Sequence, residues 1–333
     1  MKQKILITGA AGFVGFHLTK KLLTYGHNIL GIDNLNNYYS KKLKLDRIRQ
    51  IKENNFKFVK MELKNKSKLN KIFKNFKPQF IFHLAAQAGV RYSLLNPQNY
   101  IDNNITVFQN ILDLSKQYNI TMLIYGSSSS VYGNNKNEIL NETCVSDMPI
   151  SPYGVSKKSN EMMASAYSYL YKLPTLGCRF FTIYGPWGRP DMSLYKFTNK
   201  MVNNQKIELF NNGNHKRDFT YIDDAVNALS RSIIKFSNKS KIKRFFKKKN
   251  PSLILNISGN KTINLKDYLN LIAKKINKKP KIIFKNLQPG DVIKTTADIS
   301  KSNQILGYKP ETTLSKGITA FISWYKEYYK IKW

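Results

Sequence analysis

A tyrosine and a lysine four residues apart are the side chains of this sequence best suited to proton transfer. Tyr153 and Lys157 follow Pro152, which favours the start of a helix, and residues i and i+4 share one helical face. The lysine ammonium can therefore lower the pKa of the phenol from its ordinary value of about 10, and the phenolate can accept a proton from a substrate hydroxyl. The alternative is an ordinary Tyr/Lys pair on the surface.

Four consecutive serines provide hydroxyls at the end of a predicted strand. Ser127–Ser130 come where the apolar run 122–129 ends, and ligands of parallel sheets bind at the carboxyl ends of the strands. Neutral hydroxyls bind and orient a substrate, but they cannot act as general acids or bases at neutral pH. We therefore predict that Tyr153 and Lys157 are catalytic and that Ser128 and Ser130 assist them.

A glycine-rich turn indicates a dinucleotide site. Gly9, Gly12 and Gly15 directly follow the first apolar run and head an amphipathic segment, where glycine lets the backbone approach a pyrophosphate at a helix N-terminus. Asp33 ends the second apolar run, 18 residues after Gly15. A carboxylate there binds the ribose hydroxyls of adenosine and repels a 2′-phosphate, so the pattern favours NAD over NADP. A glycine turn that binds nothing is the alternative.

Apolar runs alternate with helix-length segments in the first half of the chain. The predicted strands are 4–9, 28–33, 56–63, 79–86, 122–129 and 175–185, and the first helix is 14–26. This alternation predicts an α/β fold, a doubly wound, Rossmann-like parallel sheet with helices on both faces. We predict an NAD-binding domain over 1–182. A smaller C-terminal α/β lobe over 183–333 would mainly bind substrate and return some segments to the first domain.

The charge of the chain is strongly positive but evenly distributed. Its 333 residues include 55 Lys and Arg against 20 Asp and Glu, a formal charge of +35. The lysines are spread along the whole chain, whereas a nucleic-acid site usually has clustered charge. One cluster, 235–250, is interpreted as a solvated loop between the lobes. Weak contact with an anionic membrane surface is the alternative.

Membrane spans, leaders and metal sites are not expected from the sequence. No apolar run reaches 18 residues, and the N-terminus lacks the anatomy of a signal peptide. Two cysteines, Cys144 and Cys178, are too few for a disulfide framework or a zinc site. We therefore expect a cytoplasmic protein without a metal.

These features together resemble the extended short-chain dehydrogenase/reductase family, and within it the nucleotide-sugar epimerases. The resemblance covers nearly the whole chain and includes Ile32–Asp33, HLAAQAGV (83–90) and NNITVFQNIL (103–112). It implies NAD as cofactor. Glu62 stands where the family often has Asp, but its longer side chain can still accept a hydrogen bond from the adenine amine. The cofactor-binding residues that the resemblance implies are Gly9, Gly12, Phe13, Val14, Gly15, Asp33, Asn34, Glu62, Leu63, Leu84, Ala85, Ala86, Gln87, Asn103, Tyr153 and Lys157.

Four further motifs resemble those of UDP-glucuronate 4-epimerases: AAQAGVRYS (85–93), RFFTIYGPWGRPDM (179–192), RDFTYIDD (217–224) and QPGDVIKTTAD (288–298). Sugar dehydratases of the family carry an Asp-Glu pair at the positions of residues 128–130, and decarboxylases often carry a Glu at the last of the three. Serines there favour epimerisation at C4. The substrate-binding residues implied are Arg91, Ser128, Ser129, Ser130, Thr182, Arg189, Arg217 and Asp291.

Structural roles are the alternatives for three of these residues. Arg91 would also suit a helix start or an interface, Arg217 an ion pair with Asp218 or Asp223, and Asp291 a turn after a glycine.

The resemblance implies conversion of UDP-glucuronate to UDP-galacturonate through a transient 4-keto sugar. Alternative substrates are UDP-glucose and UDP-N-acetylglucosamine, and an alternative reaction is decarboxylation of UDP-glucuronate. A non-enzymatic alternative is an RNA-binding protein on a dinucleotide fold, which would not need the Tyr153–Lys157 pair. Family members commonly form homodimers through two helices, here 98–117 and 153–172, and the product commonly feeds capsule or lipopolysaccharide synthesis.

Overall fold

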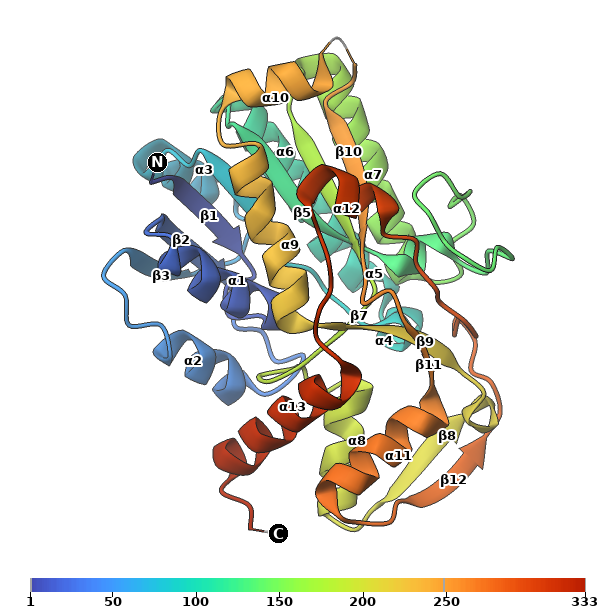
Figure 1. Ribbon diagram of the computed structural model, residues 1–333. Helices are drawn as coiled ribbons and strands as arrows, with labels where there is room; N and C mark the ends of the chain where they lie inside the picture. Colours follow the sequence, from blue (N-terminus) through green and yellow to red (C-terminus); the bar gives the residue numbers. More distant parts are fainter. Residues whose placement is uncertain (1, 248, 333) are drawn as a thin grey trace.

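A seven-stranded parallel sheet forms the centre of the molecule (Figure 1). The computed structural model describes residues 2–247 and 249–332. The strand order is β10-β6-β5-β4-β1-β2-β3, so the chain reverses its direction of winding between β1 and β4. Such a reversal opens a ligand crevice at the carboxyl edge of the sheet. The predicted doubly wound α/β fold is confirmed. The strands are β1 (Lys4–Thr8), β2 (Asn28–Asp33), β3 (Phe56–Lys60), β4 (Phe80–His83), β5 (Met122–Ser128), β6 (Thr175–Phe180) and β10 (Ser252–Ile257).

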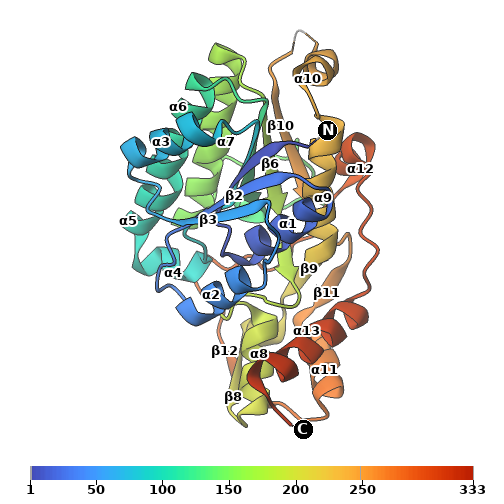
Figure 2. The same cartoon turned by 90° about the vertical axis from the view of Figure 1, so that its left-hand side faces the viewer.

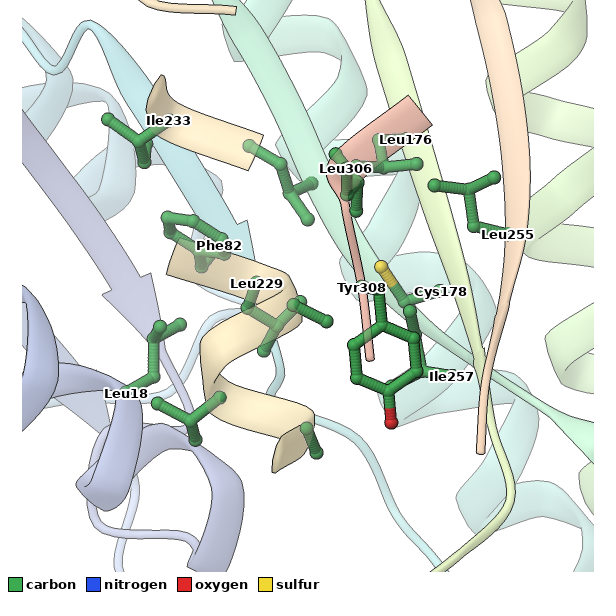
Figure 3. Packing of buried hydrophobic residues seen from close by; sticks show 14 of the residues in the cluster. Leu18, Phe82, Leu176, Cys178, Leu229, Ile233, Leu255, Ile257, Leu306 and Tyr308 are labelled. Atoms are coloured by element: carbon green, nitrogen blue, oxygen red, sulfur yellow. The ribbon is translucent and has the colours of Figure 1, made fainter. Parts of the chain in front are cut away.

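Helices cover both faces of this sheet (Figure 2). One face is packed by α1 (Phe13–Thr24), α9 (Ile222–Lys235), α10 (Lys239–Phe246) and α12 (Ser300–Leu306), and the other by α3 (Lys66–Phe76), α6 (Val107–Gln117) and α7 (Pro152–Tyr171). Alternate strand residues face opposite sides, so Ile5 and Ile7 join the first core while Leu6 joins the second. Figure 3 shows the first core, where Leu229 of α9 lies near Phe82 and Leu306 of α12 near Leu176.

A smaller C-terminal lobe carries two further sheets. One sheet has the order β11-β9-β7 and the other pairs β12 with β8. A second, aromatic-rich core joins their helices, and Phe219 stacks on Tyr268 at 4.0 Å between ring centroids. The elements are β7 (Thr182–Tyr184), β8 (Lys206–Phe210), β9 (Lys216–Tyr221), β11 (Thr262–Asn264), β12 (Lys281–Lys285), α8 (Ser193–Val202), α11 (Leu265–Ile276) and α13 (Leu314–Tyr329).

The remaining helices are short or border the sheet. A continuous helical stretch over 97–117 contains a π-helical segment, η1, which shifts its register before α6. These elements are α2 (Lys41–Arg49), α4 (Val90–Leu95), α5 (Pro97–Tyr100), η1 (Ile101–Thr106), η2 (Ser129–Tyr132) and η3 (Asn211–Gly213).

The single strand predicted over 175–185 is in fact two strands of different sheets. The chain leaves the large sheet after Phe180, and β7 then pairs with β9 of the C-terminal lobe. At the break, the Phe181 N–H still donates to the Ile257 carbonyl at 3.1 Å. The third predicted strand, 56–63, is also shorter, because β3 ends at Lys60.

The loop predicted for the basic segment 235–250 is wrong, because most of the segment forms helix α10. Asn238 caps the helix by accepting from the Lys241 N–H, and Ile242 and Phe246 are buried in the first core. The two apolar side chains are four residues apart and so share one face, which anchors the helix. α10 lies at the top of Figure 1, at the amino edge of the sheet. None of the helices in the described ranges combines the length and the apolar content needed to cross a bilayer.

Candidate active site

A cleft of about 420 Å³ lies at the carboxyl edge of the large sheet. It is lined by residues of both the sheet and the C-terminal lobe. All the predicted cofactor-binding residues line it, as do all the predicted substrate-binding residues except Arg91. Residues from distant parts of the sequence are therefore brought to one crevice, at the place where the winding of the sheet reverses.

The glycine turn between β1 and α1 has no room for side chains. Gly9 has a φ of +74°, and a Cβ there would lie 2.7 Å from the Ala85 backbone nitrogen. A Cβ at Gly15 would overlap the Gly9 carbonyl oxygen, and the Gly12 N–H already donates to that oxygen at 2.9 Å. The result is a tight cradle at the N-terminus of α1, where amide groups and the helix dipole favour a phosphate.

Asp33 ends β2 beside this cradle. Its carboxylate accepts from the Ala11 N–H at 3.2 Å and the Leu35 N–H at 2.8 Å. Burial raises the pKa of Asp33, and the two backbone hydrogen bonds and the nearby Lys44 oppose that rise. Glu62, from the segment after β3, accepts from Asn34 at 3.2 Å. Two acidic side chains thus border one end of the cleft, where an adenosine would lie.

Sequence reasoning missed four residues that also line this end of the cleft. The side chain of Lys44 is buried and donates to the backbone and side-chain oxygens of Asn36, at 2.8 and 2.6 Å. Burial is the main cause of the lowered pKa of Lys44. The run of polar and aromatic residues that follows Asp33 was the available signal. The four residues are Asn36, Tyr38, Tyr39 and Lys44.

The N-terminus of α7 carries the Tyr153–Lys157 pair. Ser151 caps the helix by accepting from the Gly154 N–H at 3.1 Å, and Pro152 occupies its first turn. Tyr153 is hydrogen-bonded to Ser128, whose hydroxyl donates to that of Ser130 at 3.1 Å. The predicted catalytic hydroxyls are therefore contiguous.

Burial dominates the titration of both members of the pair. It raises the pKa of Tyr153, against the effects of the Ser128 hydrogen bond and the Arg189 charge. It also lowers the pKa of Lys157 to about 8. The expected lowering of the phenol pKa by Lys157 is not seen, because the ammonium group instead donates to the Gly126 carbonyl at 2.7 Å. In this state, Arg189 is the cation that favours the phenolate.

The three predicted arginines have different surroundings. Arg217, on β9, donates to the Ile293 carbonyl at 2.9 Å and has no carboxylate within ion-pair distance in the described part of the chain. Its predicted alternative partners are engaged elsewhere: Asp218 accepts from the Gly259 N–H, and Asp223 lies 3.9 Å from His17. Burial lowers the pKa of Arg217 to about 10. This half-buried cation is suited to a phosphate.

Arg91 lies outside the cleft lining. It forms an ion pair with Asp291 at 2.7 Å, and its guanidinium lies 4.0 Å from the centroid of the Phe210 ring. The pair connects α4 with the loop after β12. Asp291 itself lines the cleft, so Arg91 contacts a residue of the site without facing the cavity.

The doubly wound sheet, the glycine cradle, Asp33 and the Tyr153–Lys157 pair define a short-chain dehydrogenase/reductase of the extended class. The family model described as GDP-mannose 4,6 dehydratase matches residues 6–321, and the chain belongs to this family.

Relatives resemble the chain over nearly its whole length. It is 48% identical to Protein CapI from Staphylococcus aureus, covering 98% of this chain and all of that protein. It is 37% identical to a probable UDP-glucuronate 4-epimerase from Rhizobium meliloti, covering 98% of each. The crystal structure of the UDP-glucuronic acid 4-epimerase from Bacillus cereus, in complex with UDP-glucuronic acid and NAD, has a TM-score of 0.89 at 33% identity. It covers 98% of this chain and 100% of that one.

Proposed function

We propose that the protein is an NAD-dependent 4-epimerase that converts UDP-glucuronate to UDP-galacturonate. The similar proteins from Rhizobium meliloti and Bacillus cereus bear the name of this activity, and the latter holds both UDP-glucuronic acid and NAD. The enzyme class is that of the UDP-sugar 4-epimerases, which are isomerases.

The distribution of carboxylates in the cleft is the observation that carries the proposal. Among the described residues that line it, only Asp33, Glu62 and Asp291 are acidic. Asp33 and Glu62 belong to the adenosine end, and Asp291 is paired with Arg91. Beside Tyr153 the chain offers only the hydroxyls of residues 128–130. Dehydration of a sugar needs a further acid and base at that place, so the family's dehydratase chemistry is not supported for this member.

The residues fit a bound NAD. The glycine cradle that a Cβ would fill can hold the pyrophosphate, and Asp33 can hold the adenosine ribose. When bound, NAD supplies the acceptor and then the donor of the C4 hydride. Tyr153 removes the proton from the C4 hydroxyl and later returns it. Ser128 holds the phenol by a hydrogen bond, and Lys157 brings a positive charge to the same helix turn.

The substrate must turn so that hydride returns to its other face. Arg217 can hold the diphosphate as the pivot, since its charge has no carboxylate partner within the described ranges. A 4-keto uronate is a β-keto acid and tends to lose CO2. Thr182, Ser129 and Arg189 line the cleft and can bind the C6 carboxylate, keeping it charged and oriented away from decarboxylation.

Incubation with UDP-glucuronate tests the proposal directly. The purified protein, without added cofactor, is expected to form UDP-galacturonate, resolved by chromatography, with no trapped CO2. A UDP-pentose with CO2 would instead make the enzyme a decarboxylase. Turnover of UDP-glucose but not of UDP-glucuronate would make it a neutral-sugar epimerase. No turnover of either, even with added NAD, would contradict the enzyme assignment.

A further inference from the structure

Arg189 is held by a fork of two hydrogen bonds at the wall of the cleft. Its Nε donates to Asp191 Oδ1 at 3.0 Å, and its Nη2 donates to Asp191 Oδ2 at 2.6 Å. The Tyr38 hydroxyl donates to the same Oδ2 at 3.2 Å. Such a bidentate pair fixes the plane of the guanidinium as well as its position. Arg189 and Tyr38 line the cleft, and Asp191 lies behind them.

The fork leaves one edge of the guanidinium for a ligand. Nη1 of Arg189 has no hydrogen-bond partner within residues 2–247 and 249–332. The Asp191 carboxylate also compensates the charge of Arg189. Although burial alone would raise the pKa of Asp191, Arg189 and Tyr38 hold that pKa below its ordinary value. The carboxylate therefore stays ionised at neutral pH and keeps the fork closed.

Tyr38 is itself fixed by its surroundings. Its ring lies 5.0 Å from that of Tyr92 on α4, measured between centroids. Gly89 has a φ of +104°, and any Cβ there would overlap the Tyr38 hydroxyl. Space for this hydroxyl is thus provided by a glycine. The loops after β2, β4 and β7 converge on a single carboxylate, Asp191.

We propose that Asp191 and Tyr38 are positioning residues, which aim the free edge of Arg189 at the C6 carboxylate and hold it there while the sugar is a 4-ketone. This inference rests on the proposed function. Decarboxylation breaks the C5–C6 bond, sends its electron pair into the C4 carbonyl as an enolate and releases CO2, and the enolate then takes a proton at C5. A carboxylate held in one orientation keeps the C5–C6 bond out of alignment with the carbonyl π-system and suppresses this step.

Two variants weaken the fork to different degrees. Asp191→Asn removes the charge and one acceptor, while Tyr38→Phe removes only the third hydrogen bond. With UDP-glucuronate, we expect the fraction of turnovers that release CO2 to rise about ten-fold or more in Asp191→Asn, and about three-fold in Tyr38→Phe. Tyr92→Phe is the matched control, because it removes a hydroxyl from the neighbouring ring but leaves the contacts of Asp191 intact. Its CO2 fraction should equal that of the wild type.

The ratio of products separates positioning from a merely structural role. A variant that only destabilises the protein loses epimerisation and CO2 release in proportion, and this outcome for both variants would overturn the inference. Retained NAD per protein, measured on the same samples, reports whether each variant is folded. If the wild type forms no UDP-galacturonate, the proposed function fails. If it does and the CO2 fraction is equal in all variants, only the positioning role fails.

Discussion

The cleft and the opposite, basic end of the molecule use positive charge in contrasting ways. In segment 235–250, 8 of 16 residues are Lys or Arg and none is acidic, and those that the structure describes are exposed. The cleft has few cations, but Lys157 and Lys44 are buried and Arg189 and Arg217 are half-buried. In a chain of charge +35, chemistry is thus located by the desolvation of particular charges and not by their density. Exposed lysines keep their hydration and contribute little to stability.

Removing the phenol hydroxyl should have the largest effect on the cleft. Tyr153→Phe is expected to reduce the rate of epimerisation about 1,000-fold, because general acid–base catalysis contributes roughly 100- to 10,000-fold. The ring and its 6.0 Å edge contact with Tyr100 are retained, so NAD and substrate should remain bound. Turnover is measured with UDP-glucuronate and binding by calorimetry. A rate within ten-fold of wild type would contradict the role of Tyr153.

The buried ammonium of Lys157 should make stability depend on pH. Its pKa is about 8 in the folded protein and about 10.4 when unfolded. Between these values the unfolded chain binds more protons, so the stability of the wild type rises with pH. Relative to Lys157→Met, which lacks this proton, the wild type should gain about 3 kcal/mol in unfolding free energy from pH 7 to pH 10.5. Denaturant titrations of both proteins across this range measure the gain, and parallel pH profiles would refute it.

Neutralising the basic end should have the smallest effect. Replacement of Lys239, Lys241 and Lys243 by Ser should leave epimerisation within about two-fold of wild type, since these side chains are exposed and remote from the cleft. Ile242→Ser is the contrasting variant in the same helix, expected to cost about 3 kcal/mol of stability because Ile242 is buried in the core. Sedimentation of the triple variant with anionic vesicles also tests the membrane-contact hypothesis. A large loss of turnover would mean that the charge of this end matters for catalysis.

Local patterns in the sequence were sufficient for the cofactor end. Gly9, Gly15 and Asp33 owe their roles to backbone geometry within one strand–turn–helix unit, which the spacing of a few residues reveals. The Tyr153–Lys157 spacing similarly reflects a single helix. Tyr38 and Asp191 could not be found in this way, because 153 residues separate them and only the packing of two loops brings them together.

Two errors in the expected elements have physical causes of the same kind. The run 175–185 is apolar throughout, and nothing in it shows that the hydrogen-bond partner changes from β5 and β10 to β9 after Phe180. In the basic segment, only Ile242 and Phe246 carry the helical period, and the lysines around them conceal it. Both features become clear only when the partner surface is known.

The position of β10 has a consequence for synthesis on the ribosome. This strand pairs with β6 along its full length, and the Asn256 side chain accepts from Tyr132 and donates to the carbonyls of Leu140 and Asp298. Until β10 emerges, the nascent chain has an uncovered apolar strand edge at β6, where unwanted pairing with other chains can begin. A truncated product that ends near residue 182 would keep this edge permanently. The nucleotide-binding half therefore reaches its final form only after most of the C-terminal half has been translated.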